Sequence, residues 1–156
     1  MQKSYPASEL VVDQVVSEVR KAIRRNEWIM LVEYRNEGKT LRRVTKELKG
    51  YMKVRSVKKD FDCGAYSILW GLTFSTNNLN GLRTPRKRIS HIKICGVNTN
   101  CCIIETVKGL QYLNSKITVL SKACANVFDF LDDTDNQREH KRALSTMKRW
   151  KNVYVQ

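Results

Sequence analysis

The sequence is short of residues that interrupt regular structure and of long apolar runs. Its 156 residues include only 7 glycines and 2 prolines, which excludes a collagen-like or low-complexity chain. No apolar run approaches the roughly 20 residues of a membrane-spanning helix, and the start, MQKSYPASEL, lacks the apolar core of a signal peptide. We therefore expect one domain over residues 1–156, located in the cytoplasm and making no membrane contact.

Paired cysteines and histidines at metal-binding spacing are missing as well. The five cysteines, an odd number, include no CxxC pair, and the only histidines are His91 and His140. A disulfide framework and a zinc site are therefore not expected, and we expect neither a metal nor another cofactor. Buried structural thiols are the ordinary role of most cysteines in such a chain.

Acidic residues are the minority among the charged ones. The chain has 29 lysines and arginines against 15 acidic residues, a net charge of +14. The basic residues gather in RKAIRRN, RRVTKELKGYMKVRSVKK, RTPRKR and REHKRALSTMKRWK. Such a field attracts nucleic acid or other anions, yet no RNA-binding signature accompanies it. A solvated basic surface is the favoured interpretation, and a nucleic-acid partner is the alternative.

What the sequence does contain is a regular alternation of apolar patterns. Residues 7–27 have apolar residues at helical spacing and Ser8 as a candidate N-cap. Strands are expected at 28–34, buried on both faces, and at 51–57, 91–97, 116–123 and 152–156. Further helices are expected at 63–76, about 100–114 and 134–150, and a polar loop at 77–88. This alternation predicts an α/β fold, a three-layer sandwich around a mostly parallel sheet.

The segment ICGVNTNCCIIETVKG, residues 94–109, places Cys101 and Cys102 where a strand gives way to a helix. Ligands of parallel α/β sheets bind beyond the carboxyl ends of strands. The positive end of a helix dipole lowers the pKa of a thiol in the first turn, and free N–H groups there can hold an oxyanion. A structural cysteine is the competing interpretation.

The stretch GVNTNCCIIET resembles the cysteine-hydrolase motif of the isochorismatase-like family, which includes nicotinamidases. The resemblance implies a Rossmann-like α/β/α fold, a nucleophile at Cys102, and Cys101 at a variable position. It also implies an oxyanion hole from the backbone N–H groups of Asn98 and Cys102, and a cis peptide between Val97 and Asn98. Asn100 stands where relatives have Asp. Because relatives commonly self-associate, we expect a homo-oligomer that acts on a small-molecule substrate.

Two further segments agree with this resemblance. VKKDFDCGAYSI resembles the part of the family that carries the triad lysine, which implies Lys59, with Lys58 as the alternative. A lysine beside the thiol would stabilise the thiolate and an anionic intermediate, whereas solvated loop lysines are the competing interpretation. KITVLSKACAN resembles the next strand of the family, with Lys122 in place of a common acid, and His140 falls where relatives often have histidine.

The triad aspartate of the family is not found. In relatives it ends the central strand just before a Met-Gln pair, and this chain begins at Met1-Gln2. Asp13 lies inside the first predicted helix, and Asp60 and Asp62 lie near the lysine but on a different element. Loss of the central strand would expose two apolar strand edges. We expect either a start at an internal Met of a longer frame or a short form completed by a partner strand, with impaired catalysis.

The resemblance implies hydrolysis of a C–N (amide) or related bond of a small molecule. Nicotinamidases bind metal through Asp-x-His…His, and the corresponding EYRNEGKTLRRV contains no histidine, so a metal-free reaction is expected. The alternative is a non-catalytic relative that serves as a basic binding or assembly protein.

Overall fold

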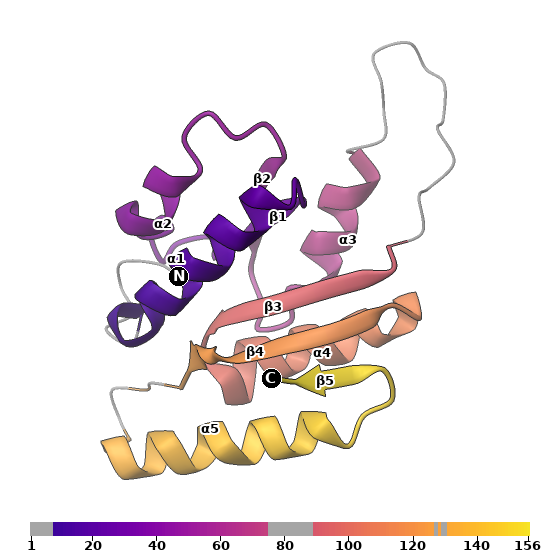
Figure 1. Cartoon of the computed structure of the whole chain (residues 1–156). Helices are drawn as coiled ribbons and strands as arrows, with labels where there is room; N and C mark the ends of the chain where they lie inside the picture. The colour runs from indigo at the N-terminus through magenta and orange to yellow at the C-terminus, as the bar shows by residue number, and fades with distance from the viewer. Residues whose placement is uncertain (1–7, 75–88, 127, 129–130) are drawn as a thin grey trace.

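The structure is a computed structural model, and it describes residues 8–74, 89–126, 128 and 131–156. The Ser8 side chain, the expected loop 77–88 and the basic segment RTPRKR lie outside the described part of the chain. Strands and helices alternate along it, as predicted (Figure 1). The elements are α1 Ser8–Arg24, β1 Ile29–Tyr34, α2 Arg42–Glu47, β2 Val54–Lys59, α3 Ala65–Phe74, β3 His91–Val97, the π-helical turn η1 Thr99–Ile103, α4 Ile104–Leu110, the 3-10 turn η2 Gln111–Leu113, β4 Lys116–Ala125, α5 Asp133–Lys148 and β5 Val153–Val155.

The strands form two parallel sheets. One has the order β1-β2, with Val32 opposite Val57, and the other has the order β3-β4-β5, with Ile94 opposite Val119. A cavity of about 720 Å³ separates β1 from β3 and is lined by residues of both strands. The two facing strand edges are those expected to be exposed when no strand lies between them.

The larger sheet forms the middle of three layers. Helix α1 packs on one of its faces, and α4 and α5 cover the other (Figure 1). The apolar core on the second face includes Leu110, Ile117, Val119 and Met147, all with 0% exposure. The α/β class with parallel strands between helices is therefore confirmed.

The smaller sheet is less enclosed than the sequence predicts. Residues of β1 are half-buried apart from Glu33, because β1 has a partner strand on one side only and the cavity on the other. The expectation that this strand is buried on both faces is therefore wrong. The Glu33 carboxylate accepts hydrogen bonds from the Thr40 N–H and hydroxyl at 2.7 and 2.6 Å and from the Lys58 ammonium at 2.7 Å. Although burial opposes it, this hydrogen bonding lowers the pKa of Glu33 to about 2.

The length and composition of the helices bear on whether any of them could span a membrane. In the described ranges, no helix combines the length and the apolar character needed to cross a bilayer.

Candidate active site

The two adjacent cysteines lie on η1, the π-helical turn that follows β3. Asn98 precedes this turn in a left-handed conformation, with φ 59° and ψ 65°, which asparagine tolerates better than most residues. Its carbonyl oxygen accepts the N–H groups of Cys101 and Ile103, both at 3.2 Å. Single π-helical turns occur frequently at functional sites.

The expectation of a cis peptide between Val97 and Asn98 is wrong, since this bond is trans. The left-handed Asn98 redirects the chain from strand to helix in its place. Asn98 is buried, and its side-chain oxygen, like that of Asn100, has no hydrogen-bond partner in the described part of the chain. The role of the Asn98 and Cys102 N–H groups as an oxyanion hole stays a prediction.

Thr99 ties the turn to β4 and α5. Its fully buried hydroxyl donates to the Ala125 carbonyl oxygen at 2.9 Å. Because this bond uses the hydroxyl proton, the Nδ1–H of His140 donates to the Thr99 oxygen, at 2.9 Å. Burial lowers the pKa of His140, so the imidazole is neutral near pH 7. The histidine that the resemblance singled out therefore contacts the cysteine turn.

The two candidate lysines at the end of β2 point in opposite directions, as successive strand residues do. Lys58 pairs with Glu33. Lys59 is buried, donates to the Asp62 carbonyl oxygen at 2.7 Å, and lies 4.4 Å from the Tyr34 ring centroid. Of the two, Lys59 is the lysine whose charge lowers the pKa of Cys102.

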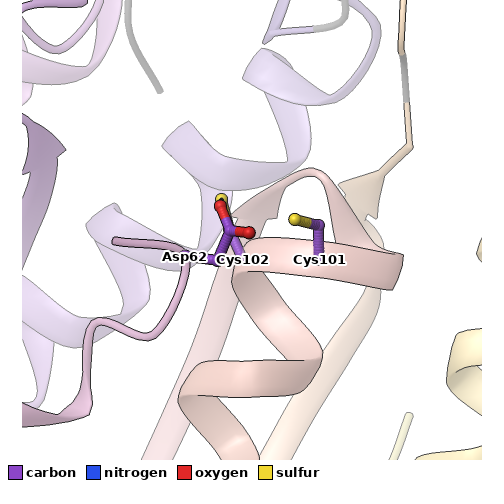
Figure 2. Close-up of side chains that lie close together, drawn as sticks. All are labelled: Asp62, Cys101 and Cys102. Carbon is purple, nitrogen blue, oxygen red and sulfur yellow. The ribbon is translucent and has the colours of Figure 1, made fainter. Parts of the chain in front are cut away.

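A third charged side chain reaches the thiol. The Asp62 Oδ1 lies 3.7 Å from the Cys102 Sγ and accepts the Tyr34 hydroxyl proton at 2.7 Å. Figure 2 shows Asp62, Cys101 and Cys102 converging, although the carboxylate comes from the loop after β2 and the thiols from η1. Hydrogen bonds from the Cys101 thiol and the Tyr34 hydroxyl lower the pKa of Asp62.

Asp62 was not predicted as a site residue, because it lies on a different element from the catalytic acid of the family. The sequence nevertheless contains a pattern from which its position near Cys102 could be predicted. Parallel strands end at the same edge of a fold, so a carboxylate just after β2 and a thiol just after β3 can meet across 40 residues of sequence.

The expectation of a lowered thiol pKa is wrong for Cys102. Burial raises its pKa, the Lys59 ammonium lowers it, and the Asp62 carboxylate raises it again. Burial and the hydrogen bond to Asp62 also raise the pKa of Cys101, to about 12. Near neutral pH the site therefore holds a Cys102 thiol beside an ionised Asp62, so attack by sulfur needs a proton acceptor.

The site opens into the cavity between the sheets. Cys102, Lys59 and Asn98 line the same cavity of about 720 Å³, together with mainly apolar side chains of α1, β1 and β3. This volume lies within the range of small-molecule sites, which is roughly 300–1,000 Å³.

The histidine-based metal set of nicotinamidases does not fit the residues present. His140 contacts the Thr99 hydroxyl, and the His91 ring is hydrogen-bonded to the Thr118 hydroxyl at 2.8 Å. Within the described ranges, the one group of three metal-binding side chains is Asp62, Cys101 and Cys102, whose ligand atoms lie within 4.8 Å of one another.

No protein-family model and no curated protein sequence matches this chain, whereas solved structures match it by fold. The nicotinamidase of Staphylococcus aureus matches with a TM-score of 0.75 over 99% of this chain and 87% of its own, at 18% identity. The nicotinamidase/pyrazinamidase of Bacillus subtilis gives 0.71 over 97% and 86%, at 17% identity. A MAR1 ribonuclease of Caenorhabditis elegans gives 0.67 over 91% and 69%, at 11% identity. The chain thus has the isochorismatase-like fold of the nicotinamidases.

Proposed function

We propose that the chain is a cysteine hydrolase that cleaves a C–N bond, or a related bond, of a small molecule. The carrying observation is the convergence on one thiol: the Asp62 Oδ1 lies 3.7 Å from the Cys102 Sγ, and Lys59, which lines the same cavity as Cys102, lowers the pKa of this thiol. In this proposal Cys102 is the nucleophile, Asp62 the general base and Lys59 the group that stabilises negative charge. Asp62 takes the role for which sequence analysis found no residue.

The first half-reaction acylates the thiol. Cys102 sulfur attacks the substrate carbonyl carbon while its proton moves to Asp62. Negative charge develops on the carbonyl oxygen, where Lys59 and the predicted N–H donors of Asn98 and Cys102 stabilise it. When the tetrahedral intermediate collapses, protonated Asp62 gives its proton to the leaving amine and a thioester remains.

The second half-reaction hydrolyses the thioester. Asp62 takes a proton from water, the hydroxide attacks the thioester carbonyl, and the Cys102 sulfur leaves and regains a proton from Asp62. The sum is amide plus water giving carboxylic acid plus amine. The raised pKa of Cys102 supports a base-assisted reaction over one that starts from a preformed thiolate.

A small primary amide is the substrate class that we favour. The cavity beside Cys102 is largely apolar and has the size of a small-molecule site. The nicotinamidases that share the fold act, by their names, on one such amide. Homo-oligomerisation and a cytoplasmic location stay predictions.

The test measures ammonia release from a panel of small primary amides that includes nicotinamide and pyrazinamide. Cys102→Ala is expected to abolish release, and Asp62→Asn to lower kcat/KM by about 10²–10⁴-fold. The matched control is Asp60→Asn, because Asp60 pairs with Arg35 at the surface and is not part of the site. It should retain wild-type activity.

A second matched pair tests the lysine. Lys59→Met is expected to lower kcat by about 10²-fold or more, whereas Lys58→Met should leave kcat near the wild-type value. Equal activity of Asp62→Asn and Asp60→Asn would contradict the role of Asp62. Ammonia release that survives Cys102→Ala would contradict the whole proposal.

A second candidate function, binding of nucleic acid through the basic surface, has two observations in its favour. The net charge is +14, and one protein that shares the fold is described as a MAR1 ribonuclease. Exposed basic residues lie around the end of α5, at Lys148, Arg149 and Lys151. Binding of labelled RNA should fall steeply with salt and weaken in the triple Glu variant of these residues. Failure to bind heparin at low salt would count against it.

A further inference from the structure

We infer that Asp62, Cys101 and Cys102 form a binding site for a thiophilic divalent cation, Zn²⁺, which occupies the nucleophile and inhibits the hydrolase. Zinc binding is inferred from the geometry of these three side chains, whereas inhibition rests on the proposed function. The site differs from the histidine-based set of nicotinamidases, for which this chain lacks the residues.

The distances between the three side chains suit a tetrahedral zinc ion. Zinc binds thiolate sulfur at about 2.3 Å and carboxylate oxygen at about 2.0–2.2 Å in tetrahedral sites, which places sulfur and oxygen about 3.6 Å apart and two sulfurs about 3.8 Å apart. The Cys102 Sγ and Asp62 Oδ1 are 3.7 Å apart. The ligand atoms of all three residues lie within 4.8 Å of one another, so a contraction of at most about 1.2 Å completes the set.

The backbone and a neighbouring hydroxyl hold the three ligands toward one another. A π-helical turn has more residues per turn than an α-helix, so consecutive side chains diverge less, and the thiols of Cys101 and Cys102 approach the same carboxylate (Figure 2). The Tyr34 hydroxyl donates to Asp62 at 2.7 Å. Such an outer hydrogen bond orients a ligating carboxylate and adds to metal affinity.

Charge and ligand type also favour a divalent cation. Binding of zinc displaces the protons of the two thiols into solvent, and the resulting two thiolates and one carboxylate carry three negative charges, which the cation and the Lys59 ammonium balance. The Lys59 ammonium can stay in place, because it is anchored on the Asp62 carbonyl oxygen at 2.7 Å. Thiolate ligands favour Zn²⁺ over Mg²⁺ and Ca²⁺.

Three protein ligands leave one tetrahedral position unfilled, the pattern of zinc sites that also bind water or a small molecule. Cys102 lines the cavity, so this position can be reached from there. Because a metal-bound thiolate is held by the ion, Cys102 cannot attack a substrate while zinc is present, and the cation acts as a reversible inhibitor.

The test uses the full chain and Co²⁺ as a spectroscopic probe for zinc. Co²⁺ should bind at one ion per chain and give a sulfur-to-cobalt charge-transfer band, and Zn²⁺ should displace it. Zn²⁺ should also protect Cys102 from iodoacetamide, and EDTA should restore labelling. Cys101→Ser should weaken Zn²⁺ binding by about 100-fold or more, since loss of even an outer-shell partner costs 10–100-fold.

The matched control is Cys63→Ser, because the Cys63 thiol contacts the Glu105 carbonyl oxygen and stands outside the cluster. Circular dichroism of each variant checks that it is folded. Zinc affinity equal in wild type, Cys101→Ser and Asp62→Asn would overturn the site, as would absence of the charge-transfer band in the wild type.

Separate outcomes distinguish the zinc site from the proposed function. Cys101 forms no covalent bond in the proposed chemistry, and a serine there can still donate a hydrogen bond to Asp62, so Cys101→Ser should still hydrolyse amides and should resist zinc inhibition. Zinc binding without amide hydrolysis would overturn the function and keep the site. Hydrolysis that is insensitive to zinc in the wild type would overturn the site and keep the function.

Discussion

The two sheets of this protein are stabilised by different kinds of contact. The β3-β4-β5 sheet is covered by helices on both faces, and Ile117 and Val119 at its centre have no exposed surface. The β1-β2 sheet has half-buried strands and one buried carboxylate, Glu33, held by Thr40 and Lys58. Apolar packing thus dominates in the first sheet, whereas a polar cluster contributes to the second.

The candidate site joins these two regions. The larger sheet supplies Cys102 on a turn tied down by Thr99 and His140. Strand β2 of the smaller sheet supplies Lys59 and the loop after it supplies Asp62, and these two residues set the charge around the thiol. The position of the nucleophile and its protonation therefore depend on separate parts of the molecule, so different mutations should change one without the other.

The largest expected effect tests the apolar packing of the larger sheet. Leu110→Ala should lower the free energy of unfolding by about 3 kcal/mol, because it removes a fully buried side chain and leaves a cavity. Urea unfolding followed by circular dichroism measures it. The control is Tyr112→Ala, at a position 90% exposed, with a change within about 0.5 kcal/mol. Equal losses of unfolding free energy in the two variants would contradict the dominance of apolar packing in this sheet.

The next effect tests the polar cluster of the smaller sheet. Glu33→Gln should lower the free energy of unfolding by about 2 kcal/mol, since it removes charge-assisted hydrogen bonds. The pKa of Glu33 is lowered from 4.5 to about 2, so its contribution is complete above pH 4.5 and is lost as the pH falls toward 2.

Urea midpoints at several pH values measure this dependence. The difference between wild type and Glu33→Gln should shrink through that acid window. Glu9→Gln is the control, because Glu9 is exposed and, within the described ranges, makes a surface contact of 3.8 Å with Arg43. A difference that does not change with pH would argue against the ionised, hydrogen-bonded carboxylate.

A smaller effect is expected where the cysteine turn is tied down. Thr99→Val should cost about 1–2 kcal/mol, because it leaves the Ala125 carbonyl and His140 Nδ1 without their partner. It should also lower hydrolysis through displacement of Cys102. Urea unfolding and kcat are measured together, with exposed Thr134→Val as the control. A stability loss with unchanged kcat would show that the turn tolerates the change.

The smallest effect on stability is expected at the candidate site, which joins the two sheets. Two variants there should shift the pKa of Cys102 in opposite directions. Asp62→Asn removes a negative charge and should lower the pKa of Cys102, whereas Lys59→Met removes a positive charge and should raise it. The pH dependence of iodoacetamide labelling measures both shifts. Asp60→Asn and Lys58→Met are the controls, and shifts of the same sign in the two test variants would contradict the arrangement.

Much of the fold could be predicted from local pattern. The sequence predicts the third strand at 91–97, as observed, because its apolar run is bounded by polar residues. Helix α2, Arg42–Glu47, was missed, since this short basic helix buries only Val44. The structure has two sheets where the sequence predicts one, because strand pairing depends on which strands are neighbours in space. The trans peptide before Asn98 was also missed, because a left-handed asparagine makes the same turn.

The α/β alternation and the place of the thiol at a strand-to-helix turn are predictable from residue patterns within about 20 positions. Which lysine and which carboxylate meet that thiol depends on contacts between segments far apart in the chain. Asp62 and Cys102 are 40 residues apart and come together because β2 and β3 end near one another. The tertiary structure also decided the sign of the pKa shift of Cys102, since burial outweighs a nearby ammonium only once the surrounding chain excludes water.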